Sequence, residues 1–210
     1  MLAAYANAED LHKVTAASIS GVALSQVTPD QRQAAKAINF GNLYRQRPAG
    51  LSRYARSSYG VEMDINQAAH AQLQFFKTYP ELYQWQLRRI QDARINGLAS
   101  TRLNLKRDFQ IRRGYLEAEA CNHPIQGSAG EILLASLAQL PNRLCGLDAR
   151  LYNHIHDEII LSVAEGDRYK AVQALEAAMV AGFLEIFPEG VALVNGLVEV
   201  KTGNNWAEVK

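Results

Sequence analysis

The chain has 210 residues, of which 48% are hydrophobic and 20% are charged, a composition that favours a globular protein of one or two domains with a sizeable core. No apolar run approaches the roughly 18 residues of a membrane helix, and the N-terminus has neither the basic start nor the apolar core of a secretory signal. We therefore expect a cytosolic protein without a membrane partner.

The net charge of +1 hides a strong asymmetry along the chain. Residues 30–115 carry 15 Lys and Arg against 6 Asp and Glu, a net charge of +9, whereas residues 116–210 carry 6 against 13, a net charge of −7. A nucleic-acid or nucleotide site beside a cation-binding carboxylate site would need such a distribution, although solvated charged helices would also produce it.

The two cysteines, Cys121 and Cys145, do not have the spacing of metal ligands. Unpaired thiols in a reducing compartment fit this pattern better than a disulfide framework does. We assign both a structural role.

Residues 1–22 are predicted to be mostly helical. The next helix has a clear start, because Thr28 suits the N-cap, Pro29 the first helical position and Gln31 the partner position of a capping box. This start predicts a helix that contains residues 32–44 and ends before the Pro48 region.

Arg32, Lys36, Phe40 and Tyr44 recur at four-residue intervals in this helix. Each step of four residues turns a helix by about 400°, so the side chains drift by only about 40° per step and share one broad face. Two cations followed by two aromatic rings suit a ligand with an anionic tail and a flat ring, such as a nucleoside triphosphate. The alternative is an ordinary amphipathic helix with Phe40 and Tyr44 in a core and both cations in solvent.

Gly41 lies inside the same helix, although glycine costs about 1 kcal/mol relative to alanine there. We infer that it allows a close approach to the backbone. Three further helices are predicted, bounded by capping residues: 51–59 before Gly60, 64–78 with Asp64 as N-cap, and 81–96 before Gly97.

Residues 98–115 are irregular and basic, which predicts a loop or hairpin. The cations of this segment are Arg102, Lys106, Arg107, Arg112 and Arg113. The segment either contacts a phosphate backbone or is a solvated loop, and the sequence leaves both open.

An Ala- and Leu-rich periodicity predicts a long helix from Leu116 to about Leu140, interrupted at residues 122–124, with its second half packed against a sheet. A helix over residues 167–183 and a strand over residues 193–201 complete the chain.

Two alternating β-prone runs, residues 150–156 and 158–163, predict a hairpin with His156, Asp157 and Glu158 at its turn. Because aspartate is a common turn residue, this acidic pair serves either the turn alone or a site.

Three separated stretches resemble motifs of family A DNA polymerases, the bacterial polymerase I and phage type. RQAAKAINFGNLY resembles the fingers-helix motif, HIHDEIIL resembles the His-Asp-Glu palm motif, and NHPIQGSAGEI resembles the helix between them. Their order and spacing also match, as do DLHKVTAA before them and TGNNW near the end. The resemblance therefore covers essentially the whole chain.

This resemblance implies a binding site for an incoming deoxynucleoside triphosphate. His12, Arg32 and Lys36 would contact the triphosphate, and Lys36 would also act in catalysis by stabilising the leaving pyrophosphate. Phe40 would lie under the sugar and base, and Tyr44 would sit where the templating base is admitted.

The resemblance also implies contacts with DNA and with Mg²⁺. Asn122, Gln126 and His156 would touch the primer-template duplex near its growing end. Asp157 would ligate catalytic Mg²⁺, with Glu158 supporting it as a second catalytic carboxylate.

The chain departs from the family pattern at several points. The strand motif resembling Asp-Tyr-Ser-Gln-Ile-Glu-Leu-Arg, which supplies the other metal aspartate, would fall before residue 1. We therefore expect that aspartate, most of the N-terminal palm, the thumb and any exonuclease domain to be lacking. Arg45 stands where the family usually has glycine, which puts the end of the preceding helix in doubt. Ala118 stands where an arginine is frequent, which implies the loss of a duplex contact.

The expected fold is α+β and helix-rich, with fingers-like helices over residues 1–115 and a partial palm with a short antiparallel sheet over residues 116–210. The reaction implied by resemblance is template-directed addition of a deoxynucleotide to a primer 3′-hydroxyl using two Mg²⁺ ions. We expect the isolated chain to be inactive, because two such ions cannot be held by one aspartate.

Three functions stay open for a chain in the cytoplasm of a bacterial or phage-infected cell. It is part of a split polymerase completed by a second polypeptide, a non-catalytic relative that binds nucleotide or DNA and forms a homo-oligomer, or a remnant without activity. Binding that weakens with salt would favour the second function over the third.

Overall fold

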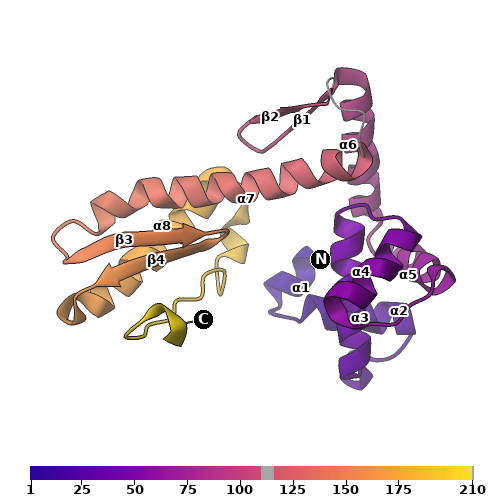
Figure 1. Cartoon of the computed structure of the whole chain (residues 1–210), viewed down its shortest axis with the longest axis horizontal. Coiled ribbons are helices and arrows are strands. Elements are labelled where there is room, and N and C mark those ends of the chain that lie inside the picture. The colour runs from indigo at the N-terminus through magenta and orange to yellow at the C-terminus, as the bar shows by residue number, and fades with distance from the viewer. Residues whose placement is uncertain (110–115, 210) are drawn as a thin grey trace. The chain divides into compact units, whose positions relative to one another are not determined.

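The structure, a computed structural model, describes residues 1–109 and 116–209, apart from the side chains of Leu2 and Ala3. The described chain is rich in helices and has two small antiparallel sheets (Figure 1), which confirms the predicted α+β class. It divides into two compact units, Met1–Ile125 and Gln126–Lys210, called here the N-terminal and C-terminal units. The proposed boundary at residues 115/116 lies next to the start of helix α7 and stays a prediction.

The N-terminal unit is mostly helical. Its elements are α1 (Leu2–Ala6), α2 (Leu11–Ser20), the short 3₁₀ helix η1 (Leu24–Gln26), α3 (Pro29–Leu43), α4 (Pro48–Tyr59), α5 (Ile65–Thr78), α6 (Pro80–Asn96), and the hairpin of β1 (Leu98–Ser100) and β2 (Lys106–Asp108). The hairpin confirms one of the two conformations predicted for this part of the basic segment.

Local capping chemistry sets the starts of two helices as predicted. The Thr28 hydroxyl accepts from the backbone N–H of Gln31, whose side chain accepts from the Thr28 N–H, and Pro29 follows the cap of α3. Asp64 and Gln67 form the same reciprocal pair at the start of α5. Each such cap stabilises its helix by about 1 kcal/mol.

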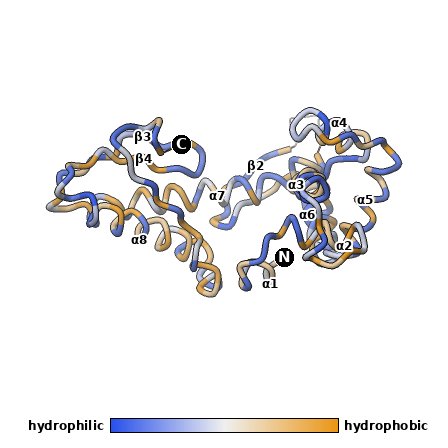
Figure 2. Tube along the Cα trace, turned by 90° about the horizontal axis from the view of Figure 1, so that it is seen from below, coloured by the Kyte–Doolittle hydropathy of each residue, from blue (hydrophilic) through white to orange (hydrophobic). Residues whose placement is uncertain are grey.

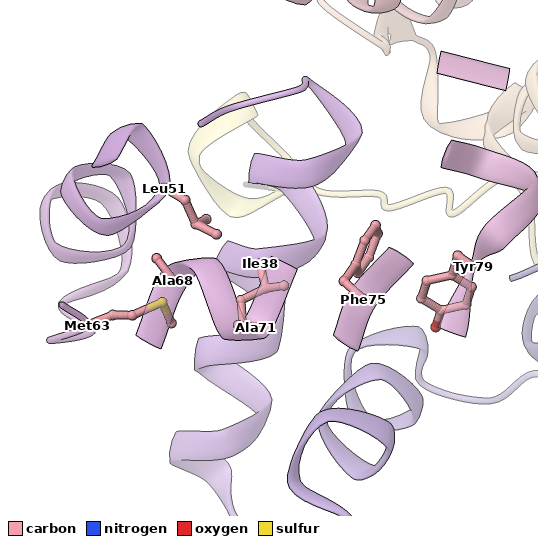
Figure 3. Packing of buried hydrophobic residues seen from close by; sticks show 7 residues of the cluster. All are labelled: Ile38, Leu51, Met63, Ala68, Ala71, Phe75 and Tyr79. Atoms are coloured by element: carbon pink, nitrogen blue, oxygen red, sulfur yellow. The ribbon is translucent and has the colours of Figure 1, made fainter. Parts of the chain in front are cut away.

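The core of the N-terminal unit lies between α3, α4 and α5 (Figure 3). Its buried members are Ile38, Leu51, Met63, Ala68, Ala71, Phe75 and Tyr79. At the end of this core the Tyr79 hydroxyl lies 2.9 Å from the Thr15 hydroxyl, so its polar tip is paired with α2 although both residues are buried.

Gly41 is required by close packing of α4 against α3. A Cβ at this position would lie 2.5 Å from Leu51 Cδ1, well inside van der Waals contact. The inference that Gly41 allows a close approach is therefore confirmed, and the approaching group is the buried Leu51 side chain.

Helix α7 (Leu116–Arg143) contributes to both units and is continuous, so the predicted interruption at residues 122–124 is wrong. Pro124 removes only one backbone N–H from the helix. The preceding turn is fixed by packing, because Ala120 belongs to a buried cluster with Ala93, Ala99 and Phe109.

Both cysteines are free thiols, but their surroundings differ. Cys121 of α7 is fully buried in the N-terminal unit, and its Sγ lies 3.9 Å from the Gln86 carbonyl oxygen. Burial raises the pKa of this thiol to about 11. Cys145, in the C-terminal unit, is exposed.

The C-terminal unit is a hairpin covered by helices. Its elements are the rest of α7, β3 (Ala149–Ile155), β4 (Glu158–Val163), η2 (Glu165–Asp167), α8 (Arg168–Ile186), η3 (Pro188–Leu193) and η4 (Trp206–Glu208). Leu140 of α7, Ile159 of β4 and Ala178 of α8 form its buried core. The second half of α7 thus packs against a sheet, as predicted.

Helices α7 and α8 pack closely against each other at Gly182. A Cβ there would lie 2.2 Å from the Ser136 hydroxyl oxygen and 2.5 Å from the Ser136 backbone nitrogen. Both residues are buried, so no side chain larger than hydrogen fits at this crossing.

The strand predicted over residues 193–201 is wrong. Leu193 ends η3, and residues 198–203 have no regular secondary structure. A strand needs a neighbour for its backbone hydrogen bonds. A cavity of about 440 Å³ is lined by residues of β4 and α8 together with residues 200–206.

Within the described ranges, no helix is long and apolar enough to cross a membrane. Figure 2 shows hydrophilic residues interrupting the hydrophobic ones along α7 and α8. Leu137 and Leu140 of α7 and Leu175 and Ala178 of α8 face the core of the C-terminal unit, whereas Leu134 of α7 is exposed.

Candidate functional site

The four-residue stripe predicted from the sequence lies on α3 and at its end, and it is called here the α3 stripe: Arg32, Lys36, Phe40 and Tyr44. All four residues are half-buried, beside the fully buried face that carries Ala35 and Ile38. In the part of the chain that the structure describes, the main core cluster takes Ile38 from α3 but neither aromatic ring. The stripe thus borders the core and reaches solvent.

Asp10 connects the start of α2 to Arg32. Its Oδ1 atom caps α2 by accepting from the backbone N–H groups of His12 at 2.9 Å and Lys13 at 3.2 Å. Its Oδ2 atom accepts from Arg32 Nε at 2.6 Å. Partial burial acts to raise the pKa of Asp10, but the bonds from Arg32 and from the two backbone N–H groups outweigh it and hold the pKa below its ordinary value.

His12 faces α3 from the first turn of α2. Its Nδ1 atom lies 2.8 Å from the Asn39 side-chain nitrogen, and its ring centroid lies 5.8 Å from that of Phe40. Because Asn39 donates to Nδ1, the neutral imidazole carries its proton on Nε2 and can donate it to a ligand.

The surroundings of His12 disfavour the charged form of its imidazole. Burial lowers the pKa of the imidazole below 6.5; the Asp10 carboxylate opposes this, and the positive charges of Arg32 and Lys36 reinforce it. Asp10 bonds both the His12 backbone and Arg32, and Lys36 lies one turn after Arg32 on the same face of α3, so these three residues lie near one another. We call Asp10, His12, Arg32, Lys36, Asn39 and Phe40 the α2–α3 cluster.

Lys36 is restrained by a pair of tyrosines from α4. Its Nζ atom lies 5.8 Å from the centroid of the Tyr59 ring, whose negative face attracts an ammonium group. The Tyr59 hydroxyl lies 3.3 Å from the Tyr54 hydroxyl. Burial and this hydrogen bond raise the pKa of Tyr54 to about 12, so the Tyr54 hydroxyl keeps its proton near pH 7 beside Tyr59.

The end of α3 resolves the doubt raised by Arg45. Helix α3 ends at Leu43, Tyr44 caps it, and Arg45 takes the left-handed conformation with φ 57° that usually favours glycine. The backbone N–H of Gln46 donates to the Gly41 carbonyl at 2.9 Å and that of Arg45 to the Asn42 carbonyl at 3.1 Å. These two bonds form a Schellman motif, so the turn keeps its shape without a glycine.

The Arg45 side chain anchors this turn to α6. Its guanidinium lies 5.2 Å from the Tyr83 ring centroid and 5.8 Å from that of Phe76, and Nη1 donates to Gln86 Oε1 at 3.3 Å. Gln86 is fully buried and donates at 2.7 Å to the Asn42 carbonyl at the end of α3. Contacts with α5 and α6 thus offset part of the backbone strain at Arg45.

The basic hairpin and the exposed side of α7 carry further predicted residues. Lys106 of β2 is exposed, and Arg107 pairs with Glu119 of α7 at 3.1 Å. Asn122 and Gln126 are exposed residues of α7, four positions apart. Arg112 and Arg113 lie outside the described residues. Asn122 belongs to the N-terminal unit and Gln126 to the C-terminal unit, and their role in DNA binding stays a prediction.

His156, Asp157 and Glu158 lie at the turn of the β3–β4 hairpin, as the sequence predicts. Ile155 pairs with Glu158, so the turn has two residues, and His156 adopts a φ of 54°. All three predicted site residues are exposed. They belong to the C-terminal unit.

The donor set at this turn does not fit a two-metal centre. Among the described residues, no group of three or more His, Cys, Asp or Glu side chains is placed to hold a metal ion. One Mg²⁺ is commonly held by one or two carboxylates with phosphate oxygens and water. Two ions about 3.5–4 Å apart need carboxylates from a second element, so Asp157 and Glu158 would supply only part of such a centre.

The family-level sequence profile described as DNA polymerase family A matches residues 1–208. The chain belongs to DNA polymerase family A. This membership agrees with the resemblance carried by the three motifs, and it accounts for their order along essentially the whole chain.

Relatives within family A support the assignment. DNA polymerase I of Aquifex aeolicus is 32% identical over 181 residues, which are 85% of this chain and 31% of the relative. DNA polymerase I of Caldicellulosiruptor bescii is 31% identical over 220 aligned positions, which cover 100% of this chain and 24% of the relative. The chain thus spans about a quarter to a third of the length of these family A polymerases.

A solved structure supports the fold. The POL domain of Pol1 from M. smegmatis, in complex with DNA primer-template and dNTP, matches with a TM-score of 0.75 and 26% identity, over 85% of this chain and 32% of that chain. The described fold is therefore shared with part of a polymerase domain.

Sequence reasoning did not assign Asp10 and Asn39 to the α2–α3 cluster, nor Tyr59 to the contact with Lys36. Asp10 carries the signal of an N-cap, a short acidic residue directly before a helical run, but its bond to Arg32 joins residues 22 positions apart. Asn39 and Tyr59 have no local signal, because their partners come from other helices.

Proposed function

We propose that the N-terminal unit binds a deoxynucleoside triphosphate at the α2–α3 cluster, as the fingers part of a family A polymerase. The observation that supports this most is that Asp10 joins His12 of α2 to Arg32 of α3, beside the Phe40 ring and on the helix face that carries Lys36. Two cations and a neutral imidazole donor match the oxygens of a triphosphate, and the ring matches the sugar and base.

Nucleotide binding is tested by titrating a deoxynucleoside triphosphate into the 210-residue chain by calorimetry. Arg32→Ala/Lys36→Ala is expected to weaken binding at least tenfold, since each charge-assisted hydrogen bond contributes roughly 1.5–3 kcal/mol. The control is Lys77→Ala/Arg88→Ala, which removes the same charge from exposed positions on α5 and α6. Equal weakening by both double variants would reduce the effect to net charge and contradict the proposal.

We further propose that the C-terminal unit is a partial palm that presents Asp157 and Glu158 as its share of a Mg²⁺ site. When bound, Mg²⁺ would neutralise charge on the phosphates. His156, Asn122 and Gln126 would contact primer-template DNA, in line with the DNA and dNTP present in the M. smegmatis structure. Lys36 would stabilise the leaving pyrophosphate.

On this basis the chain alone is expected to bind but not to polymerise, because the carboxylates at the β3–β4 turn cover only part of a two-metal centre. The test is primer extension by the purified chain with Mg²⁺ and deoxynucleoside triphosphates. Extension that Asp157→Ala abolishes would show that the isolated chain is a complete polymerase.

The C-terminal unit gives one reason to favour completion by a second polypeptide over a remnant. Among the described residues, β3 and β4 pair only with each other, and the cavity beside β4 separates this strand from residues 200–206. Unpaired strand edges are sites of strand addition. Restored extension on mixing with a protein that carries the other palm motif would support a split enzyme, whereas a homo-oligomer would appear in sedimentation of the chain alone.

A further inference from the structure

We propose that Asp10 is a positioning residue of the nucleotide site, fixing Arg32 and the start of α2 to each other so that Arg32 and His12 meet the same phosphate chain. This inference rests on the nucleotide binding proposed above. It assigns a role to a carboxylate that lies beside an anion site, where a negative charge alone would oppose binding.

The two oxygens of Asp10 serve different helices. Oδ1 accepts from the His12 backbone N–H at 2.9 Å and so fixes the residue whose imidazole faces Phe40. Oδ2 accepts from Arg32 Nε at 2.6 Å. One rigid carboxylate therefore sets the distance between the first turn of α2 and the guanidinium on α3.

The contact leaves the other side of the guanidinium available. Arg32 Nε is the only atom of this side chain with a hydrogen bond to the described part of the protein, so Nη1 and Nη2 keep their donors for a ligand. A guanidinium is a planar fork, and holding one edge orients the opposite edge. The Arg32 side chain is 39% exposed, which gives a ligand access to it.

Charge and geometry make opposite predictions for the loss of Asp10. If the carboxylate acts only through charge, removing it makes the site more positive and strengthens anion binding. If it positions Arg32, removing it weakens anion binding, because Arg32 must then be ordered at the moment of binding. The sign of the change therefore distinguishes the two.

Asp10→Ser is the informative variant. Serine is a good N-cap and preserves the start of α2, but its side chain is too short to cap α2 and also reach Arg32. Asp10→Asn keeps an oxygen that can accept from Arg32 Nε while removing the charge. Glu62→Ser is the matched control, since it removes an equal charge and a 2.7 Å ion pair with Arg56, a residue outside the α2–α3 cluster.

The experiment titrates deoxyadenosine triphosphate and inorganic tripolyphosphate into the full chain at one salt concentration. Asp10→Ser should weaken binding of both probes about five- to tenfold, the loss expected when one arginine side chain must be ordered at the moment of binding. Asp10→Asn should weaken it less, and Glu62→Ser should not weaken it. In an Arg32→Ala background, Asp10→Ser should change binding less than about twofold, because coupled residues are non-additive.

Two results would overturn the inference while leaving the proposed function intact. In one, Asp10→Ser binds both probes as tightly as the wild type or more tightly, although Arg32→Ala weakens binding. In the other, Asp10→Ser weakens binding equally with and without Arg32. Failure of the wild type to bind either probe would instead contradict the proposed function, and this inference with it. Urea unfolding of each variant shows that it is folded.

Discussion

Arg45 shows how a single residue can depart from a family pattern without breaking a turn. Its left-handed backbone costs about 1 kcal/mol relative to glycine, and its guanidinium recovers part of that cost on Tyr83, Phe76 and Gln86. A glycine would avoid the backbone strain at this turn, whereas Arg45 offsets part of it through side-chain contacts with α5 and α6.

We predict a stability order for substitutions at Arg45. Arg45→Ala keeps the backbone strain and loses the side-chain contacts, so it should destabilise the chain by about 1–2 kcal/mol. Arg45→Gly loses the same contacts but relieves the strain, so it should be about 1 kcal/mol more stable than Arg45→Ala. Urea unfolding measures both, and equal stability of the two variants would show that the turn is not strained.

His12 makes the stability of the N-terminal unit depend on pH. Its pKa in the folded chain lies below the ordinary 6.5, so the unfolded chain binds more protons as the pH falls. The stabilising contribution is present above about pH 6.5 and is lost as the pH falls through the lower, folded-state pKa.

We therefore expect the wild type to lose stability relative to His12→Gln between about pH 7.5 and pH 5.5, on either side of the ordinary imidazole pKa. Urea unfolding of both proteins at each pH measures the change. A difference in unfolding free energy that stays constant, or moves in favour of the wild type at low pH, would contradict the lowered pKa.

The positions of the site residues were predictable where a local pattern encodes a helix face or a hairpin turn. The spacing of Arg32, Lys36 and Phe40 placed them on one side of α3, and the structure has them there. Asp10 and Tyr59 come from other helices, and no local pattern says which distant side chain they meet. A sequence encodes a helix face locally, but the far side of a site depends on packing.

At the scale of elements, the close packing of α4 against α3 requires that residue 41 has no side-chain carbon. Gly41→Ala should destabilise the chain by about 1–3 kcal/mol, since the overpacking against Leu51 exceeds the roughly 1 kcal/mol gained from helix propensity. Gly130→Ala is the matched control, because it lies inside α7 with no atom within 4 Å of the added Cβ. That variant should be about 0.5–1 kcal/mol more stable than the wild type.

The two substitutions are compared by urea unfolding, with Leu51→Ala added to the first. If Leu51 is the obstacle, Gly41→Ala should cost less in the Leu51→Ala background than in the wild type. An additive result would point to another obstacle, such as Gln46, whose Oε1 would lie 3.2 Å from the new Cβ.

Elements with local signals were predicted well, and elements that depend on distant partners were not. The caps at Thr28 and Asp64 consist of residues three positions apart, so their chemistry is visible in the sequence. The segment over residues 193–201 is apolar enough for a strand, but among the described residues it pairs with no other strand. Helix α7 continues through Pro124 because the cluster around Ala120 holds the preceding turn, which the local sequence cannot show.

At the scale of the whole molecule, the basic half of the sequence should govern binding to DNA. We expect affinity for a primer-template duplex to fall steeply as salt rises, with each phosphate contact adding about −0.9 to the slope of log affinity against log salt. Lys106→Ala, on the exposed β2 strand, should reduce the slope by about 1.

The control is Lys170→Ala, an exposed lysine of α8 in the acidic C-terminal unit. Fluorescence anisotropy over a salt series measures both slopes. An equal change in the two variants would mean that binding responds to net charge alone, and an unchanged slope in Lys106→Ala would exclude the β1–β2 hairpin from the DNA contact.

Because one thiol is exposed and the other is buried, their rates of reaction with a thiol reagent report how often the N-terminal unit opens. Cys145 is exposed and should react at once with a maleimide, which gives a label in the C-terminal unit without mutagenesis. Cys121 is buried with a raised pKa, so it should react only when the N-terminal unit opens. Mass spectrometry should therefore show one rapid and one slow modification in native buffer, and a deoxynucleoside triphosphate bound at the α2–α3 cluster should slow the second further.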